Sequence, residues 1–303
     1  MTRIACALFF TAALSMTPLA QAADIAVPSN LNFKRLQLLD KPDREHKDGK
    51  LKVYVTVKGE DVGGKLLVSS AKYLQNITVT NLRQMLLDKI GDTQRFEVFD
   101  QELSGVMDES SIIVVGQVVG ATQHIENLVV ARKAITRVRL SVNISDTANG
   151  KVLRAKTFTG HYGDKRGEGT VIVSTAELTS EQTQESLYKD YDRAMSDALN
   201  DVADYVESRY RPVGKITELS GDSFAMDGGY DHGFNGDDEV VVFRTQFSIV
   251  NGERVPGIMT GLARAKCPSV NDRSSTCQVV MKGSDGPIKH GDYVVVSDET
   301  LAR

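Results

Sequence analysis

The chain has 303 residues, with 36 Lys and Arg against 40 Asp and Glu and a formal net charge of −4. This length is sufficient for two hydrophobic cores, and the mild acidic excess argues against nucleic acid as the natural partner, because phosphate binding requires a clustered basic face. Beyond the first residues no stretch approaches the ~18 apolar residues of a membrane helix, so we expect no transmembrane segment in the mature chain.

Residues 1–22 have the layout of a secretory signal peptide. Arg3 precedes an uncharged apolar run, IACALFFTAALSM, and AQA at 20–22 forms an A-x-A cleavage site. The run is too short to cross about 30 Å of hydrocarbon as a membrane anchor, and no Leu-x-x-Cys box for a lipid anchor is present. We expect cleavage between Ala22 and Ala23 and a periplasmic mature protein, with association to the outer membrane left open.

From residue 23 to 50 the chain is polar and contains prolines, and we interpret it as an extended tail or linker that could order against a partner. Residues 52–58 (KVYVTVK) alternate valine with other side chains, which predicts a strand. Apolar residues then recur at spacings of three and four across 78–90, which predicts a helix packed on a sheet. Thr78 is its expected N-cap and Gly91 its expected terminator.

Two strands and a hairpin are predicted next. Residues 95–100 (RFEVFD) form a short strand, and 111–121 (SIIVVGQVVGA) has the continuous apolar character of a central strand covered on both faces. Apolar residues alternate along 137–146 (RVRLSVNISD), which predicts another strand. A tight turn, ANG at 148–150, leads into a further strand at 151–159.

A glycine-rich, charged loop is predicted at 160–169 (GHYGDKRGEG), followed by the longest helical pattern of the chain at 180–210. Pro212 ends this helix, and we place the domain boundary there. Short valine-rich strands and turns beyond it predict a small barrel. A faint repeat fits this pattern, because NGDDEVVV at 235–242 and KHGDYVVV at 289–296 both start a strand from a glycine–aspartate turn.

Cleavage of the signal peptide removes Cys6, and two cysteines remain in the mature chain. Cys267 and Cys277 lie close in sequence and are even in number, which is typical of a small disulfide loop in an oxidising compartment. Zinc binding is the competing interpretation, but two thiols without a nearby histidine make a poor zinc site. The pair therefore predicts a disulfide.

The order of elements between residues 51 and 211 resembles the curli secretion channel (CsgG) family and the related N-terminal domain of the TolB family. The matching stretches are NLRQML at 81–86 with RFEVFD at 95–100, IVVGQV at 113–118, and the hairpin VRLSVNISDT at 138–147 with NGKVL at 149–153. With a C-terminal barrel, the arrangement is similar to the flagellar T family, which forms the H-ring of polar sheathed flagella. The N-terminal domain of that family is missing or reduced to 23–50, and the lipid anchor of the curli channel is absent.

The sequence offers no catalytic constellation and no cofactor motif. Neither G-x-x-x-x-G-K-[ST], H-E-x-x-H nor G-x-S-x-G occurs, so we expect no enzyme, no cofactor and no metal. The histidines lie in segments that we interpret as loops or strand ends, outside any such motif. We interpret all five as surface residues: His46, His124, His161, His232 and His290.

An acidic cluster, DGGYDHGFNGDDE from Asp227 to Glu239, has two interpretations. Its carboxylate and amide oxygens are of the type that binds calcium. The D-x-[DN]-x-[DN]-G order of a calcium loop is absent, however, and glycine–aspartate turns are common between the strands of a barrel. Turn chemistry is favoured, and calcium binding is left open.

Two further segments are candidates for contact surfaces. Residues 160–183 have only VIV at 171–173 as an apolar run, whereas a transmembrane strand needs about 9–11 alternating residues. We therefore interpret them as a loop at a subunit or partner interface and not as a pore. The long helix has an acidic side, which is either simply solvated or faces a basic neighbour in an assembly. Its aspartates are Asp190, Asp197, Asp201 and Asp204.

The expected fold is α+β: a signal peptide at 1–22, an extended segment at 23–50, a CsgG/TolB-N-like mixed sheet with packed helices at 51–211, and a small all-β barrel at 212–303. The expected function is that of a periplasmic non-catalytic scaffold or assembly factor of an envelope-spanning machine, a flagellar basal-body ring or a secretion apparatus. It would contact envelope proteins, or copies of itself in a ring. The alternative is a soluble binding or activator module for peptidoglycan or a cell-wall synthase.

Overall fold

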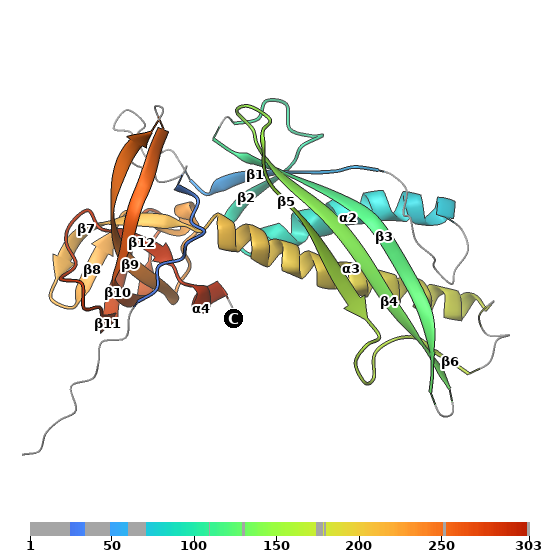
Figure 1. The fold of residues 1–303 in the computed structure, drawn as a ribbon. Helices are drawn as coiled ribbons and strands as arrows, with labels where there is room; N and C mark the ends of the chain where they lie inside the picture. Colours follow the sequence, from blue (N-terminus) through green and yellow to red (C-terminus); the bar gives the residue numbers. More distant parts are fainter. Residues whose placement is uncertain are drawn as a thin grey trace, which may run out of the picture.

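The computed structural model is drawn in Figure 1. It describes residues 25–33, 49–59, 71–108, 110–128, 131–173, 178, 180–250 and 253–301. The predicted cleavage site at Ala22 and Ala23 lies outside the described residues, as does His46. Among the helices that are described, none combines the length and the apolar character needed to cross a membrane.

The first unit is a mixed sheet with two long helices, as predicted. Its elements are β1 (Leu51–Val57), α2 (Ala71–Asp92), β2 (Phe96–Asp100), β3 (Ile112–Asn127), β4 (Arg132–Asp146), β5 (Val152–Tyr162), β6 (Val171–Ile172) and α3 (Glu181–Arg209). The strand order is β2-β1-β3-β4-β5, with β6 paired to β4. β1 is parallel to both of its neighbours, whereas β3, β4 and β5 are antiparallel. The strands therefore leave β2 and β5 at the two edges.

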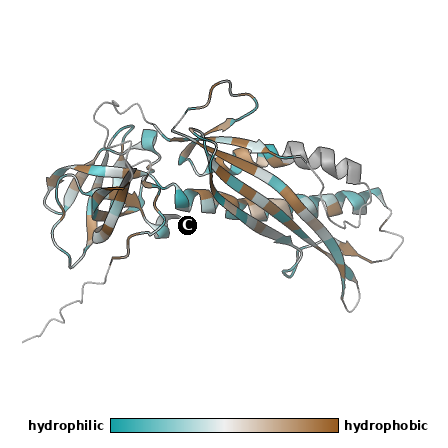
Figure 2. Ribbon diagram, turned by 45° about the horizontal axis from the view of Figure 1, so that its top comes forward, coloured by the Kyte–Doolittle hydropathy of each residue, from teal (hydrophilic) through white to brown (hydrophobic). Residues whose placement is uncertain are grey.

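Only one face of this sheet is covered by helices. Val114 and Val118 on β3 are buried with Leu82 and Leu86 of α2 in one core, while alternate β3 residues such as Val115 stay partly exposed. Figure 2 shows the resulting alternation of apolar and polar colour along the long strands. The prediction that 111–121 is covered on both faces is therefore wrong, because its apolar run includes residues of the uncovered face.

Helix α2 differs from its prediction at both ends. It begins at Ala71, seven residues before the expected cap, so Thr78 is an interior helical residue. It also continues past Gly91 to Asp92, and the chain then turns at Gln94, which has a left-handed φ of 58°. No glycine or proline lies between residues 71 and 90, so nothing in this stretch breaks the helix before the expected cap.

Helix α3 lies along the sheet as predicted. The side chain of Ser180 caps it by accepting a hydrogen bond from the backbone N–H of Thr183. Its apolar side packs closely on β5, because Gly160 has no side chain to separate the two elements. A Cβ at Gly160 would lie 1.9 Å from the carbonyl oxygen of Ala194 and 2.5 Å from the backbone nitrogen of Ala198. Gly160 is thus a strand residue at a helix contact, and the loop predicted from residue 160 begins only after Tyr162.

We expect Gly160→Ala to lower the free energy of unfolding by about 2–3 kcal/mol, because backbone atoms of α3 cannot rotate away from the added methyl group. Gly91→Ala is the matched control, since nothing lies within 4 Å of a Cβ at that position. Urea unfolding of the three proteins measures the difference. Equal midpoints for the Gly160 and Gly91 variants would contradict this packing.

The second unit consists of antiparallel strands, four of them short and two, β9 and β10, with 13 and 18 residues. Its elements are β7 (Val213–Ser220), β8 (Ser223–Met226), a 3-10 turn η2 (Tyr230–His232), β9 (Asp238–Val250), β10 (Glu253–Val270), β11 (Ser275–Lys282), β12 (Tyr293–Val296) and α4 (Asp298–Leu301). The six strands are hydrogen-bonded in the closed order β10-β11-β8-β7-β12-β9. Phe224, Phe234 and Leu262 fill the interior, together with Cys267 and Cys277. The Sγ atoms of the two cysteines are 2.00 Å apart, which confirms the predicted disulfide.

The two copies of the faint repeat are neighbouring strands. β9 and β12 pair antiparallel, with Val242 opposite Val294. In each copy the aspartate where the strand begins is buried and accepts a hydrogen bond from the backbone N–H three residues earlier. This bond runs from Asn235 to Asp238 over 2.8 Å and from Lys289 to Asp292 over 2.6 Å. Both copies of the repeat therefore form the same turn, one leading into β9 and the other into β12.

The N-terminal segment is packed on the second unit. Leu31 is buried against Val241, Tyr293 and Val295, which lie on the side of β9 and β12 opposite the barrel interior. The ring of Phe33 meets that of Phe247 edge-on, with centroids 6.3 Å apart. The interpretation of 23–50 as a tail is therefore wrong for residues 25–33, whose apolar side chains cover an apolar strand face.

Candidate interaction surfaces

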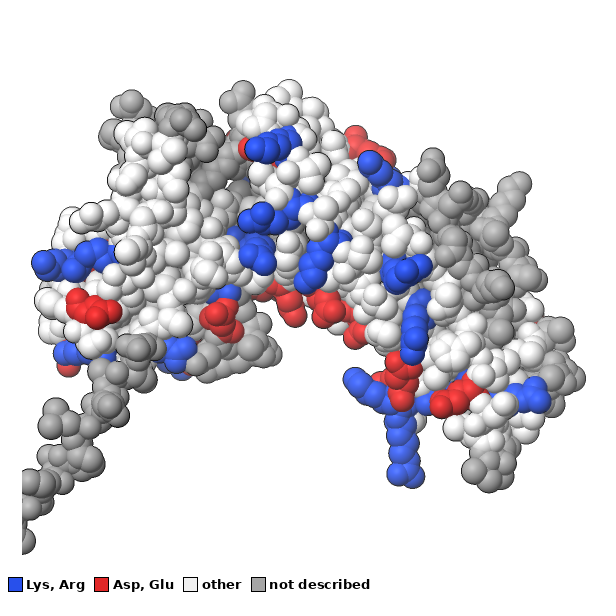
Figure 3. All heavy atoms as spheres, in the orientation of Figure 1, with Lys and Arg blue, Asp and Glu red and all other residues white. Residues whose placement is uncertain are grey.

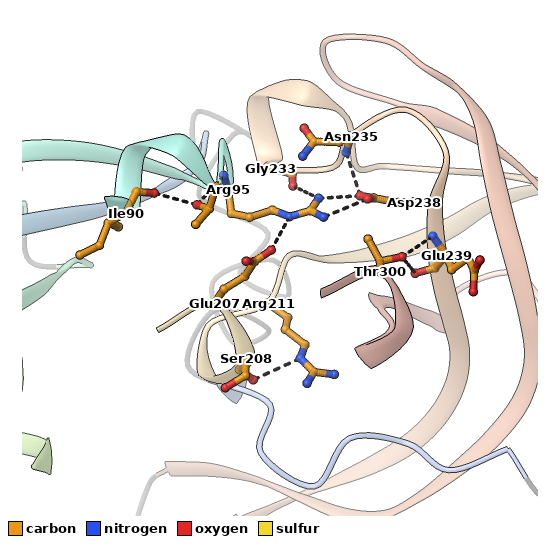
Figure 4. A network of polar contacts seen from close by, with 11 residues as sticks. Ile90, Arg95, Glu207, Ser208, Arg211, Gly233, Asn235, Asp238, Glu239 and Thr300 are labelled. Carbon is orange, nitrogen blue, oxygen red and sulfur yellow. Dashed lines mark hydrogen bonds and ion pairs between the residues drawn. The ribbon is translucent and has the colours of Figure 1, made fainter. Parts of the chain in front are cut away.

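A buried ionic network joins the two units (Figure 4). Arg95, just before β2, donates from Nη1 and Nη2 to the two carboxylate oxygens of Asp238 over 2.6 and 2.9 Å. Its Nε donates to Glu207 of α3 over 2.9 Å, and Nη1 also donates to the carbonyl oxygen of Gly233 over 2.9 Å. Arg95, Glu207 and Asp238 are all buried. One guanidinium from the sheet unit therefore binds the barrel and holds the two units in a defined orientation.

Burial also affects the pKa of Glu207, one of the two acids of this network. It raises the pKa of Glu207, and the hydrogen bond and charge of Arg95 oppose that rise. Two buried carboxylates so close together would repel each other without the guanidinium between them. The arrangement has no open substrate position, because the donors of Arg95 are directed at protein oxygens. We interpret it as a structural joint.

The uncovered side of the sheet carries an excess of positive charge. From residue 131 to 162 the only acidic residue is Asp146, which is buried. The same stretch contains six exposed cations: Arg132, Arg137, Arg139, Lys151, Arg154 and Lys156. Arg137 and Arg139 alternate with core residues along β4 and therefore lie on the uncovered face, and we call these two the basic band. Arg154 and Lys156 lie opposite Ile144 and Val142 on the helix side of the sheet, where Lys156 Nζ is 4.7 Å from the ring centroid of Tyr205 on α3. Within the described residues none of the six forms an ion pair. Figure 3 shows Lys and Arg gathered over this half of the molecule, with Asp and Glu along its lower rim.

Helix α3 carries the opposite charge. Asp197, Asp201 and Asp204 are exposed and share one side of the helix by their spacing of four and three residues, and we call them the acidic row. Partial burial raises the pKa of Asp204, and the neighbouring charge of Asp201 raises it further. In the described part of the chain no cation pairs with these carboxylates. Asp190 does not belong to the row, because it is buried and accepts a hydrogen bond from the backbone N–H of Thr170 over 2.7 Å.

An open groove of about 470 Å³ runs between the end of β5 and α3. Its charges are largely paired among themselves. His161 Nδ1 lies 3.2 Å from a carboxylate oxygen of Asp164, and Arg193 stacks over the ring of Tyr162 while donating to its hydroxyl over 2.5 Å. The backbone N–H of His161 donates to Asp197 over 3.0 Å. These contacts order the groove.

The β9–β10 hairpin presents apolar side chains to solvent. It extends beyond the rest of the barrel (Figure 1), and Ile249 and Ile258 are 78% and 89% exposed. Val250 and Val255 at the same end are also exposed. The base of the hairpin is anchored, because Phe247 packs edge-on against Tyr293 with centroids 5.8 Å apart. A cluster of exposed apolar residues on an anchored hairpin is typical of a protein contact.

Of the four described histidines that were predicted to lie at the surface, three do so and one does not. His124, His161 and His290 are exposed, as expected, but His232 is buried in η2, where its Nδ1 faces the backbone N–H of Gly229 at 3.4 Å. The interpretation of His232 as a surface residue is wrong, because the glycines around it bring the chain close to the loop at 271–272.

The acidic cluster Asp227–Glu239 acts through protein contacts. Asp227 accepts a hydrogen bond from the backbone N–H of Lys215, Asp237 pairs with Lys266, and Asp238 binds Arg95. Across the described ranges no three His, Cys, Asp or Glu side chains converge on a position suited to a metal ion. Sequence reasoning missed Arg95 and the pairing role of Asp238, although the repeat that aligns Asp238 with Asp292 was visible.

No family model matches the chain, and no curated protein matches it. Among solved structures, the hypothetical protein CT253 from Chlamydia trachomatis is 11% identical over 52% of this chain and 98% of its own, with a TM-score of 0.31. A neuraminyllactose-binding hemagglutinin homolog from Helicobacter pylori is 11% identical over 54% and 86%, with a TM-score of 0.34. The dodecamer of the L103M variant of PelC from Paraburkholderia phytofirmans is 12% identical over 50% of this chain and 90% of its own, with a TM-score of 0.26. With TM-scores this low, these likenesses do not bear on the function of the chain.

Proposed function

We propose that this chain is an exported, non-catalytic scaffold or assembly factor of an envelope-spanning machine, of the flagellar basal-body or secretion type. The observation that supports it best is the exposed apolar end of the β9–β10 hairpin, held on a body whose two units are joined through Arg95. Burial of apolar surface is the main driving force of protein association, and a rigid body transmits the position of one contact to another. The sequence resemblance to the CsgG, TolB N-terminal and flagellar T families fits this role.

The hairpin is expected to be the contact with an envelope protein. Replacing Ile249 and Ile258 with serine removes two exposed apolar side chains and should weaken partner binding roughly 100-fold, since a buried isoleucine contributes about 1.5–3 kcal/mol. A photo-crosslinking residue at position 258, placed in the intact chain in cells, identifies the partner. The double variant is then compared with the parent in binding to that purified partner.

Val280→Ser is the control, because Val280 on β11 is exposed to a similar degree but lies away from the hairpin end. It should bind the partner as the parent does. The proposal fails if position 258 gives no crosslink to an envelope protein and a deletion strain has normal motility and surface appendages. Retention of the chain on purified peptidoglycan, unaffected by the hairpin variant, would instead support a cell-wall binding module.

A further inference from the structure

The basic band and the acidic row are complementary, but the chain does not use them on each other. No side chain of the band reaches a carboxylate of the row among the described residues. Each surface is therefore available to a partner of the opposite charge, and each is complementary to the other surface of a second copy.

Protection of a sheet edge does not explain the band. Exposed strand edges often carry Lys or Arg, because these charges prevent unwanted strand pairing. This account suits Arg154 and Lys156 on the edge strand β5. It does not suit Arg137 and Arg139, because β4 is paired with β3 on one side and with β5 on the other. Two arginines on one face of a central strand need another reason.

The acidic row also needs an explanation, because its carboxylates repel one another. Asp201 and Asp204 are close enough for the charge of one to raise the pKa of the other, so the row is destabilised by its own repulsion when no cation is near. A partner that brings guanidinium groups to this helix side would relieve that repulsion. The basic band of another copy supplies such groups on an uncovered sheet face.

We propose that the chain self-associates through the basic band of one copy and the acidic row of another. This inference rests on the proposed scaffold function, for which it names a second copy as a partner. The contact is electrostatic at its core, so ions in solution weaken it, and it lies on the sheet unit, away from the apolar hairpin of the barrel. The two surfaces leave the hairpin free for an envelope protein.

The test is sedimentation of the mature, full-length chain at low ionic strength and at about 0.5 M salt, where charges are screened beyond a few ångströms. We expect concentration-dependent association at low salt that is lost at high salt. R137E/R139E should weaken it about 30-fold or more, and D201K/D204K by a similar factor, because like charges then face each other. All four residues are exposed, and circular dichroism verifies that the variants fold.

Charge exchange separates a direct contact from a general effect. Mixing R137E/R139E with D201K/D204K should restore association, and so should all four substitutions in one chain. The control R273E/K289E makes the same change in net charge on exposed barrel residues and should associate like the parent. A parent chain that stays monomeric at low salt, or exchange that fails to restore association, overturns the inference. In either case crosslinking from Ile258 still tests the scaffold function independently.

Discussion

Arg95→Ala should lower the free energy of unfolding by about 3–5 kcal/mol, the typical effect of removing one partner from a buried ion pair. The substitution leaves Asp238 and Glu207 buried without a cation, and it removes the hydrogen bond to the carbonyl oxygen of Gly233. Because this side chain joins the two units, we also expect the variant to unfold in two calorimetric steps. In the parent chain the joint should couple the units into one step.

The matched control is Arg83→Ala. Arg83 also binds two carboxylates, Asp100 and Glu102, but the second of these is exposed, so a loss of less than about 1 kcal/mol is expected. Similar losses for the two arginine variants would contradict the structural role of Arg95. A single calorimetric step in the Arg95 variant would show that other contacts couple the units.

The effect of Arg95→Ala should depend on pH. Burial holds the folded-state pKa of Glu207 above its usual 4.5, so the stability that this group contributes is fully present below pH 4.5 and is lost as the pH rises through the folded value. Without Arg95 to favour the ionised form, that pKa rises further. The difference in unfolding free energy between parent and variant is therefore smallest near pH 4.5 and larger at neutral pH.

Replacing Cys267 and Cys277 with alanine is expected to lower the free energy of unfolding by about 3 kcal/mol. The disulfide joins β10 to β11 across a sequence separation of 10 residues, and closing a loop of this size restricts the unfolded chain by about that amount. Both residues are fully buried in the barrel core, so the loss should appear in the unfolding of the barrel and not in that of the sheet unit.

Reduction of the parent chain provides the comparison. After unfolding and refolding in dithiothreitol, the parent should match the alanine variant in chemical denaturation, because both then lack the crosslink. Combining the alanine variant with Arg95→Ala should lower only one of the two calorimetric steps. A loss spread over both steps would mean that the barrel and the sheet unit share more stabilising contacts than the network of Arg95.

Much of the fold follows from local periodicity. The mixed sheet, the long helix α3 and the valine-rich strands were all predictable, because each buries one regular stripe of side chains. The sequence prediction assigned burial on both faces to the wrong strand. Full burial was predicted for 111–121, yet it occurs along β12 and the start of β9, where Leu31 covers the outer side. A cover from a distant segment leaves no periodic signal in the strand that it covers.

The contact surfaces were less predictable than the fold. In the sequence, an arginine at the end of a turn cannot be distinguished from a solvated one. The role of Arg95 becomes visible only in the fold, which brings Asp238 beside it from far away in the sequence. The acidic side of α3 was visible from spacing, but spacing alone included Asp190, which is turned inward by Thr170. The basic band was missed because the sequence does not show which side of β4 the helices leave uncovered.

The docking of residues 25–33 has a consequence for the order of folding. Residues 25–33 pack on β12. β12 is the last strand of the barrel in chain order, and it also pairs with β7 and β9. In a chain delivered N-terminus first, all strands and helices of the sheet unit at 51–210 are present early, whereas the barrel stays open until Val296 has emerged. The first described segment of the chain therefore cannot dock until β12, more than 250 residues later, has been made.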